Sequence, residues 1–252
     1  MMRLDRLLIL ILLSACALHT QAQGSRAAAG EIRSVITDWS YPLRVYLPAG
    51  YETSQHTYPV LYAVDAEVRF DRLADMLDEF ELQIIMIGIA NTGNERREVD
   101  FIMPGAKAYA DFLTDELVPW VDNRYRTDPT ARGMAGHSLG GLISALTMLS
   151  EAPDMRRFNT FLISDGSFWN QPAATQELFA TLNEQTRSLP VRLFVTGATR
   201  GNIRGVRFFL DELINSNLVG LDLTYRVYQQ SHKDVQWPSF RDGLLTLYAG
   251  RD

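Results

Sequence analysis

A serine in a glycine-rich turn is the residue of this chain best suited to covalent chemistry. The segment Gly136-His137-Ser138-Leu139-Gly140 fits the pattern G-x-S-x-G, and residues 139–149 continue it with helical spacing. A serine at a strand-to-helix turn is held in a strained conformation with its hydroxyl projecting from the sheet. The pattern alone is weak evidence, because glycine-rich turns without a catalytic role also carry it. The strand before this turn and the helix after it favour the catalytic interpretation. We predict Ser138 as a nucleophile, with the N–H of Leu139 as an oxyanion donor.

A serine hydroxyl needs a base near neutral pH, and the chain has four histidines. His19 lies upstream of the fold, and His56 lies in a polar loop. His137 adjoins the serine, so its side chain should point elsewhere. His232 follows the last predicted strand, residues 223–228. In serine hydrolases with a G-x-S-x-G turn the triad residues follow in the order serine, acid, histidine, so the base is expected after that strand. We therefore predict His232 as the general base.

Apolar runs that alternate with helical patterns must position these residues. Predicted strands comprise residues 43–47, 59–64, 84–89, the run that ends at Gly136, 160–163, 191–195 and 223–228. Predicted helices comprise residues 70–80, 108–121, 139–149, 175–187, 206–214 and 235–248, while 91–100 has the composition of a polar loop. The alternation predicts an α/β fold with a mostly parallel central sheet and helices on both faces. Such sheets carry their sites at the carboxyl ends of the strands.

Length and composition are those of one globular domain that does not bind nucleic acid. The chain has 252 residues, 46% of them hydrophobic, and a net charge of −6. The absence of a Lys or Arg run argues against nucleic acid as a partner. The sequence holds no metal-ligand spacing, phosphate loop or dinucleotide fingerprint, so we expect neither a metal nor a cofactor.

The first residues have the pattern of an export signal. A short charged start precedes the apolar run 7–13, which is too short to span a bilayer. Cys16 follows Leu13-Ser14-Ala15 and resembles the lipidated cysteine of bacterial lipoproteins. We expect a signal peptide over residues 1–15, with cleavage after residue 22 as the alternative. Residues 16–30 are then a flexible tether and 31–252 the domain, either periplasmic or anchored to the outer membrane by lipid alone.

Four motifs together resemble the α/β-hydrolase fold, and within it the putative esterase family that includes esterase-D-like and siderophore trilactone esterases. They are Tyr58-Pro59-Val60-Leu61-Tyr62 with Asp65, Val121-Asp122-Asn123-Arg124-Tyr125-Arg126-Thr127, Gly136-His137-Ser138-Leu139-Gly140-Gly141, and Ser231-His232. The resemblance implies a serine esterase without a large cap domain, acting on a small-molecule ester. An acyltransferase with the same machinery and a non-catalytic binding protein are the alternatives.

The resemblance also places the second oxyanion donor, in the loop after residues 60–64. Relatives tend to carry Asp-Gly there, and this chain has Asp65-Ala66. We expect the N–H of Ala66 to be the donor. Because a backbone group donates, alanine can stand in place of glycine.

The catalytic acid is the part that departs from the family pattern. The family expects a Glu or Asp after residues 191–195, but residues 196–202 contain no carboxylate. One alternative is a Ser–His dyad. The other moves the acid to Asp165, at the end of the preceding strand, where a loop or helix-capping role is equally open.

Three residues are candidates for contact with the substrate. Arg97, beside Arg96, lies in a loop that resembles a substrate-facing loop of the family and could bind an anionic or carbonyl-rich group. A solvated surface pair is the alternative. Phe168 and Trp169 are expected to line an acyl or aromatic pocket, with core packing as the alternative.

Overall fold

The computed structural model describes residues 23–152 and 154–250 and contains one eight-stranded sheet. The strands are β1 (Ser25–Ser34), β2 (Trp39–Leu47), β3 (Tyr58–Val64), β4 (Ile85–Ile89), β5 (Thr127–His137), β6 (Thr160–Ser164), β7 (Arg192–Arg200) and β8 (Asp222–Ser231). Their order across the sheet is β1-β2-β4-β3-β5-β6-β7-β8. Only β1 and β2 pair antiparallel with their neighbours, so the predicted mostly parallel sheet is confirmed.

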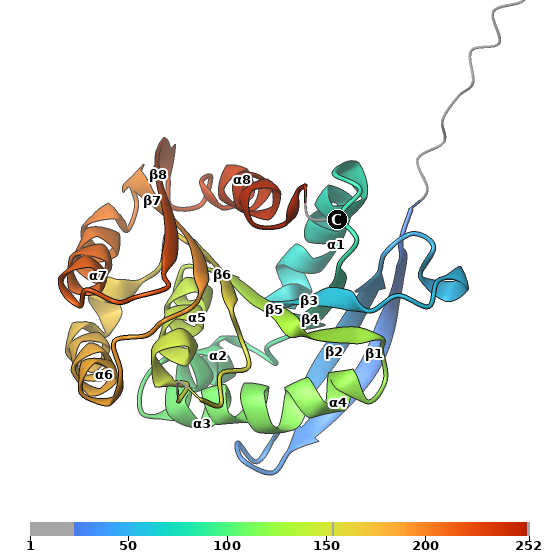
Figure 1. Cartoon of the computed structure of the whole chain (residues 1–252), viewed down its shortest axis with the longest axis horizontal. Coiled ribbons are helices and arrows are strands. Elements are labelled where there is room, and N and C mark those ends of the chain that lie inside the picture. Colours follow the sequence, from blue (N-terminus) through green and yellow to red (C-terminus); the bar gives the residue numbers. More distant parts are fainter. Residues whose placement is uncertain (1–22, 153, 251–252) are drawn as a thin grey trace, which may run out of the picture.

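Helices cover both faces of this sheet, as Figure 1 shows. On one face lie α1 (Ala66–Glu79) and α8 (Gln236–Tyr248). The other face carries α2 (Asn94–Phe101), α3 (Gly105–Asp111), α4 (Val118–Asp122), α5 (Leu139–Ser150), α6 (Pro172–Gln185) and α7 (Ile203–Asn215). Short single turns, η1 (Tyr51–Thr53) and η3 (Phe168–Asn170), complete the helical elements.

The sheet is buried because its central strands are apolar on both sides. In β3, Val60, Tyr62 and Val64 pack into the cluster under α5. Leu61 and Ala63 pack into the cluster under α1 and α8. A strand that is buried on both faces needs such a continuous apolar run, which is how the sequence indicated it.

Two segments differ from the sequence-based expectation. Residues 25–30, expected in a flexible tether, belong to β1, which pairs antiparallel with β2. Their alanine-rich composition does not indicate the edge strand that they form. Within this strand, Gly30 at φ 93° marks a shift in the register of pairing with β2. Residues 94–101, expected within a polar loop, form α2, in which Asn94, Glu95 and Glu98 are exposed while Asp100 and Phe101 are buried.

The long helix expected over residues 108–121 is present but irregular. It runs through α3, a π-helical stretch η2 (Phe112–Leu117), and α4, with Pro119 in the first turn of α4. Proline lacks an N–H and clashes with the preceding turn, so the backbone widens ahead of it. A π-helical segment therefore precedes Pro119 within the expected helix.

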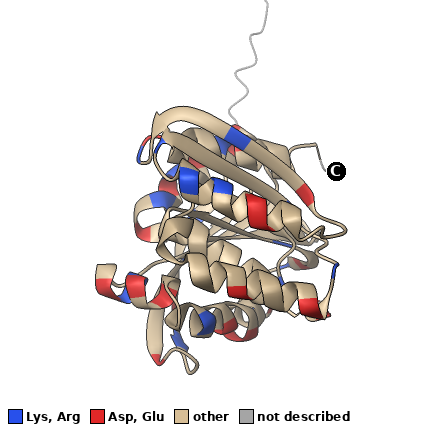
Figure 2. Ribbon diagram, turned by 90° about the vertical axis from the view of Figure 1, so that its left-hand side faces the viewer, with Lys and Arg blue, Asp and Glu red and all other residues tan. Residues whose placement is uncertain are grey.

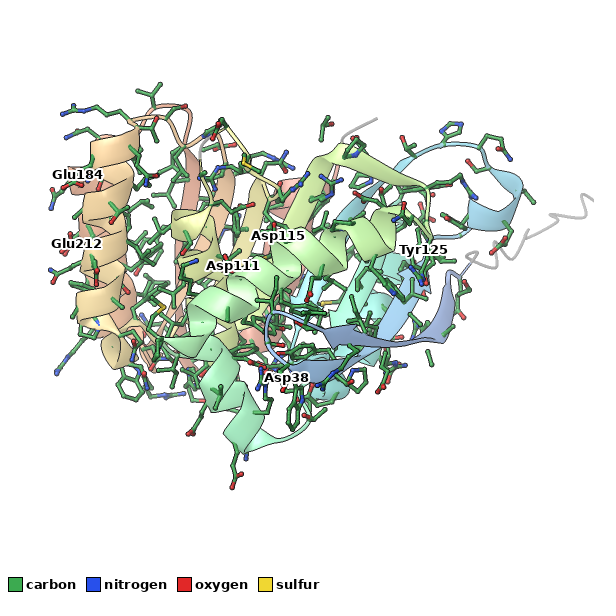
Figure 3. All side chains as sticks on the ribbon, turned by 90° about the horizontal axis from the view of Figure 1, so that it is seen from below. Asp38, Asp111, Asp115, Tyr125, Glu184 and Glu212 are labelled. Carbon is green, nitrogen blue, oxygen red and sulfur yellow. The ribbon has the colours of Figure 1, made fainter. Side chains whose placement is uncertain are left out.

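Positively and negatively charged residues are mixed along the helices. Figure 2 shows Lys and Arg interspersed with Asp and Glu on the face that it presents. In Figure 3, Asp111 and Asp115 lie along one helical segment, and Glu184 and Glu212 mark α6 and α7. This mixture agrees with the absence of a long basic run in the sequence.

Candidate active site

Ser138 occupies a strained turn between β5 and α5. Its backbone has φ 63° and ψ −122°, a region that residues other than glycine rarely adopt. The Ser138 N–H donates to the Ser164 carbonyl at 3.0 Å, and the Ser138 carbonyl accepts from Ser167 N–H at 3.0 Å. A side chain at Gly136 would collide with the Gly140 carbonyl, so this position requires glycine. The turn therefore has the form that the G-x-S-x-G pattern predicted.

The Ser138 hydroxyl begins a hydrogen-bonded relay through three side chains. Its Oγ lies 2.9 Å from His232 Nε2, and His232 Nδ1 lies 2.6 Å from Asp165 Oδ2. The carboxylate accepts from Nδ1–H, which leaves Nε2 free to accept the serine proton. The structure therefore brings together all three predicted residues, from the ends of β5, β6 and β8, in the order that general-base activation of serine requires.

Asp165 is held in place by several hydrogen-bond donors. Its side chain is fully buried, and its backbone has φ 46°. Besides His232, the carboxylate accepts from Ala198 N–H at 2.8 Å and from Asn202 N–H at 3.1 Å. The loop after β7, which lacks an acid, thus supplies the hydrogen bonds that fix an acid on the neighbouring strand.

Sequence reasoning missed Ser167 and Asn202, which support the relay. Asn202 Nδ2 donates to the Asp165 carbonyl at 2.9 Å and to Ser167 Oγ at 3.1 Å. Ser167 Oγ in turn lies 3.1 Å from Ser138 Oγ. No local pattern marks either residue. The only sequence signal was their position, since both follow strand ends on either side of the predicted site.

His137 stacks on the proposed base instead of pointing away from it. The two imidazole rings have centroids 4.5 Å apart at an interplanar angle of 28°. His137 Nδ1 lies 3.1 Å from Ser164 Oγ, and the residue is 4% exposed. Burial, and next the nearby His232, lower the pKa of His137 to about 3. A neutral ring therefore supports the His232 imidazole from one side.

This buried imidazole should make stability depend on pH. The folded chain keeps His137 neutral down to a pKa of about 3, whereas the unfolded chain takes up the proton near 6.5. Between these values the unfolded state binds more protons, so the free energy of unfolding falls by about 1.4 kcal/mol per pH unit as the pH drops. His137→Gln should remove this contribution, measured by denaturant unfolding at pH 7, 6 and 5. His56→Gln, at an exposed histidine, is the control. If the free energy of unfolding fell equally with pH in His137→Gln and in the wild type, the result would contradict a buried neutral His137.

The two residues predicted as oxyanion donors lie at helix amino termini. Leu139 is the first residue of α5 and Ala66 the first residue of α1. The first N–H groups of a helix have no acceptor within the helix and carry its positive dipole end. A Cβ on Gly140 would lie 3.0 Å from Asp65 Oδ2, so the turn before Ala66 packs directly on the first turn of α5. Both predicted donors thus begin helices at this edge of the sheet.

The three predicted substrate contacts have different surroundings. Arg97 lines the cavity at Ser138, but its Nε and Nη2 are paired with Asp65 at 2.6 and 2.8 Å. Phe168 is fully buried and stacks on Phe209 at 4.2 Å, so its expected place in a pocket was wrong and the core alternative holds. The turn η3 directs Phe168 inward while Trp169 stays 62% exposed.

Two hollows adjoin the relay. One of about 350 Å³ is lined by Ser138 and His232 and, apart from Val68, by other polar side chains. The other, about 450 Å³, is lined by Trp169, Arg200, Arg204 and the segment around Asn202. Asn202 touches the relay, so both hollows lie at the carboxyl edge of the sheet.

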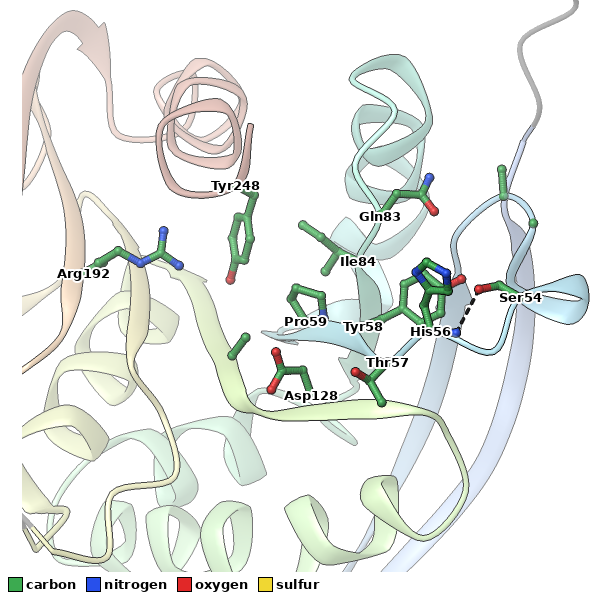
Figure 4. Close-up of a pocket in the computed structure, with 13 residues that line it drawn as sticks. Ser54, His56, Thr57, Tyr58, Pro59, Gln83, Ile84, Asp128, Arg192 and Tyr248 are labelled. Carbon is green, nitrogen blue, oxygen red and sulfur yellow. Dashed lines mark hydrogen bonds between the residues drawn. The ribbon is translucent and has the colours of Figure 1, made fainter. Parts of the chain in front are cut away.

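A further hollow of about 810 Å³ lies at the opposite edge. Figure 4 shows Tyr58, Pro59 and Arg192 at the amino ends of their strands, with Tyr248 beside them. Sites of open α/β sheets lie outside the carboxyl ends, so this hollow is not the candidate active site.

Two further observations concern metals and membranes. Within residues 23–152 and 154–250, no group of three or more His, Cys, Asp or Glu side chains is placed to hold a metal ion. No helix in the same ranges is both long and apolar enough to cross a bilayer.

Comparison with known proteins identifies the family. A family model described as "Putative esterase" matches residues 34–188, more than half of the chain. The chain belongs to this esterase family. The chain is also similar to the uncharacterized protein YbbA of Bacillus subtilis, 29% identical over 149 residues, which are 52% of this chain and 58% of YbbA. Ferri-bacillibactin esterase BesA of the same organism is 26% identical over 147 residues, 46% of this chain and 50% of BesA. The chain thus spans about half the length of the curated relatives that it matches.

Solved structures support the fold. An IroE-like serine hydrolase from Shewanella oneidensis superposes with a TM-score of 0.75 and 22% identity, over 90% of this chain and 80% of that one. The enterobactin and salmochelin hydrolase IroE gives a TM-score of 0.69 and 19% identity, over 90% and 96% of the two chains. The predicted α/β-hydrolase fold is therefore confirmed.

Proposed function

We propose that the protein is a serine esterase that forms an acyl-enzyme on Ser138. His232 takes the hydroxyl proton as Ser138 attacks the ester carbonyl, and the imidazolium then gives this proton to the leaving alcohol. Asp165 orients the imidazole and stabilises its charge. A water molecule, activated by His232, then releases the acid and regenerates the serine.

The observation that carries this proposal is the unbroken hydrogen-bonded relay from Ser138 through His232 to Asp165, which starts at a strained turn. The N–H groups of Leu139 and Ala66 are the proposed donors to the tetrahedral oxyanion. Such donors each contribute about 10²- to 10³-fold to turnover. Membership of an esterase family supports the same reaction.

The alternatives are an acyltransferase with the same site and a non-catalytic binding protein. A panel of chromogenic esters and catechol trilactones tests all three. Steady release of acid is expected for an esterase, whereas an acyltransferase would form new esters with added alcohols. No turnover by the wild type, with no covalent labelling of Ser138, would favour the binding protein.

We further propose a bulky ester as the substrate. In the described part of the chain, one α-helix, α6, and the turn η3 separate β6 from β7, so the site lacks a large cap there. Names of similar proteins point the same way, since they include ferri-bacillibactin esterase, a siderophore hydrolase and a ferulic acid esterase. The exposed Trp169 indole beside Arg200 and Arg204 would receive a planar, polar part of such a molecule.

Trp169→Ala should therefore weaken the use of large esters specifically. Loss of one aromatic contact is expected to raise KM for a catechol trilactone by about 2- to 10-fold. The KM for p-nitrophenyl acetate should stay unchanged, because the small ester does not reach the indole. Trp39→Ala, at an exposed tryptophan in β2, is the matched control. Equal KM values for the trilactone in the wild type and Trp169→Ala would contradict this assignment.

We propose that the protein is exported and lipidated at Cys16; the signal segment lies outside the described residues. The segment Leu13-Ser14-Ala15-Cys16, with its resemblance to the lipoprotein signal, supports this proposal. Mass spectrometry of the native amino terminus should reveal a diacylglyceryl cysteine, absent in Cys16→Ser. A soluble chain that begins near Gln23 would refute lipidation.

A further inference from the structure

Asp65, the residue directly before the proposed oxyanion donor Ala66, is held by three side chains. It is 2% exposed and has a left-handed backbone with φ 57°. Arg97 donates to both carboxylate oxygens, from Nε at 2.6 Å and from Nη2 at 2.8 Å. Asn91 Nδ2 donates at 2.7 Å, and Arg69 Nη1 lies 3.1 Å from Oδ2. Charge-assisted hydrogen bonds such as those from Arg97 are about twice as strong as neutral ones.

These bonds join four separate elements at the oxyanion turn. Asp65 follows β3, Arg69 lies in α1, Asn91 follows β4, and Arg97 lies in α2. The Asp65 carboxylate also packs against Gly140 in α5, two residues after Ser138. The position of the turn relative to the nucleophile is thus set by the Asp65 carboxylate and its partners.

The guanidinium groups of Arg69 and Arg97 share the Asp65 carboxylate. The Glu67 carboxylate lines the same cavity and acts electrostatically on both arginines. Removing one cation would leave the buried carboxylate with less compensation, and the turn would relax to restore hydration. A shift of about 1 Å at a catalytic group can cost on the order of a hundredfold in rate.

We propose that Arg97 is a positioning residue for the oxyanion hole, where it holds Asp65 so that the Ala66 N–H faces the ester carbonyl oxygen. This role rests on the proposed esterase function and replaces the expectation that Arg97 binds the substrate directly. It acts in the transition state, where the oxyanion forms. Its loss should therefore change kcat much more than KM.

Arg96 provides a matched control on the same helix. Arg96 Nη2 pairs with the buried Asp100 at 2.5 Å, and the two arginine side chains have similar exposed fractions, 16% for Arg96 and 21% for Arg97. Arg96 is not among the residues that line the cavity at Ser138. Both substitutions to glutamine break one buried ion pair, but only Arg97→Gln releases Asp65.

The experiment measures kcat and KM for a chromogenic ester, and the affinity for an arylboronic acid that mimics the tetrahedral adduct. Arg97→Gln should lower kcat and boronate affinity about a hundredfold with KM within threefold, and Arg97→Lys should recover part of the loss. Arg96→Gln should leave all three values within threefold. Thermal unfolding verifies that each variant folds. If Arg97→Gln does not fold, the same kinetic and binding measurements are made on Arg97→Lys instead.

Equal losses in the Arg96 and Arg97 variants, or a rise in KM alone for Arg97→Gln, would overturn the positioning role. If the wild type hydrolyses no ester and Ser138 takes no covalent label, the proposed function fails instead. The role is then read from the ¹⁵N–¹H resonance of Ala66, which should shift in Arg97→Gln and not in Arg96→Gln. An Ala66 resonance that stays in place in both variants would overturn the positioning role without reference to activity.

Discussion

Replacing Ser138 with alanine is expected to lower kcat for the best ester substrate by about a millionfold. The hydroxyl is the only group of the relay that can form the acyl-enzyme, and its Oγ lies 2.9 Å from His232 Nε2. Without it, only oxyanion stabilisation and binding remain, and these leave a small residual rate. Steady-state kinetics of Ser138→Ala, with substrate binding measured separately, gives the result.

Ser167→Ala is the matched control, because its Oγ lies 3.1 Å from that of Ser138 in the same site. This hydroxyl accepts a hydrogen bond from Asn202 Nδ2 and shares another with Ser138 Oγ, but it is not the predicted nucleophile. Its loss should cost less than about tenfold in kcat, in line with the loss of neutral hydrogen bonds. A Ser138→Ala variant that keeps more than about 1% of the wild-type rate would mean that the nucleophile lies elsewhere.

The second large effect is expected for Asp165→Asn, which should lower kcat by about 10⁴-fold while KM changes little. The asparagine side chain keeps the shape of the acid but no longer stabilises the imidazolium, and it can stabilise the wrong tautomer of His232. The variant also loses acceptor capacity for Ala198 and Asn202 N–H, so its Tm should be measured with the kinetics.

Asp234→Asn is the control for a carboxylate in the same loop as the base. Asp234 is exposed, its carboxylate accepts from the Ser231 hydroxyl, and its N–H donates to the same hydroxyl, so the change should leave kcat within about twofold. A loss of about tenfold or less in Asp165→Asn would instead assign a Ser–His dyad, despite the 2.6 Å contact between Asp165 and His232.

The sequence was sufficient to predict the tight turn at Ser138 and the position of His232 near it, because both depend on local patterns. Gly136 and Gly140 mark a close approach of strand and helix, and His232 follows an apolar run. The sequence did not decide between Asp165 as the catalytic acid and a Ser–His dyad, because the choice depends on the conformation of the loop after β7. In this loop the backbone N–H groups of Ala198 and Asn202 donate to the Asp165 carboxylate. Backbone donors of this kind cannot be predicted from residue types.

Other differences have equally specific causes. The segment around Arg97 has the composition of a solvent-facing loop. In the structure this segment is helix α2, which directs Arg97 toward Asp65, 32 residues earlier in the chain. Phe168 and Trp169 were indistinguishable as neighbouring aromatics, and only the turn η3 separates the buried ring from the exposed one. In β1, small side chains at the sheet edge gave no alternation, so residues 25–30 resembled a tether.

The most direct test of the account is covalent labelling of the native protein with a serine-directed fluorophosphonate, followed by peptide mass spectrometry. The account predicts one adduct, on Ser138, formed fast in the wild type, slowly in Asp165→Asn and absent in Ser138→Ala. Undiminished labelling of Ser138→Ala, or an adduct on another serine such as Ser167, would contradict the assignment of Ser138 as the nucleophile.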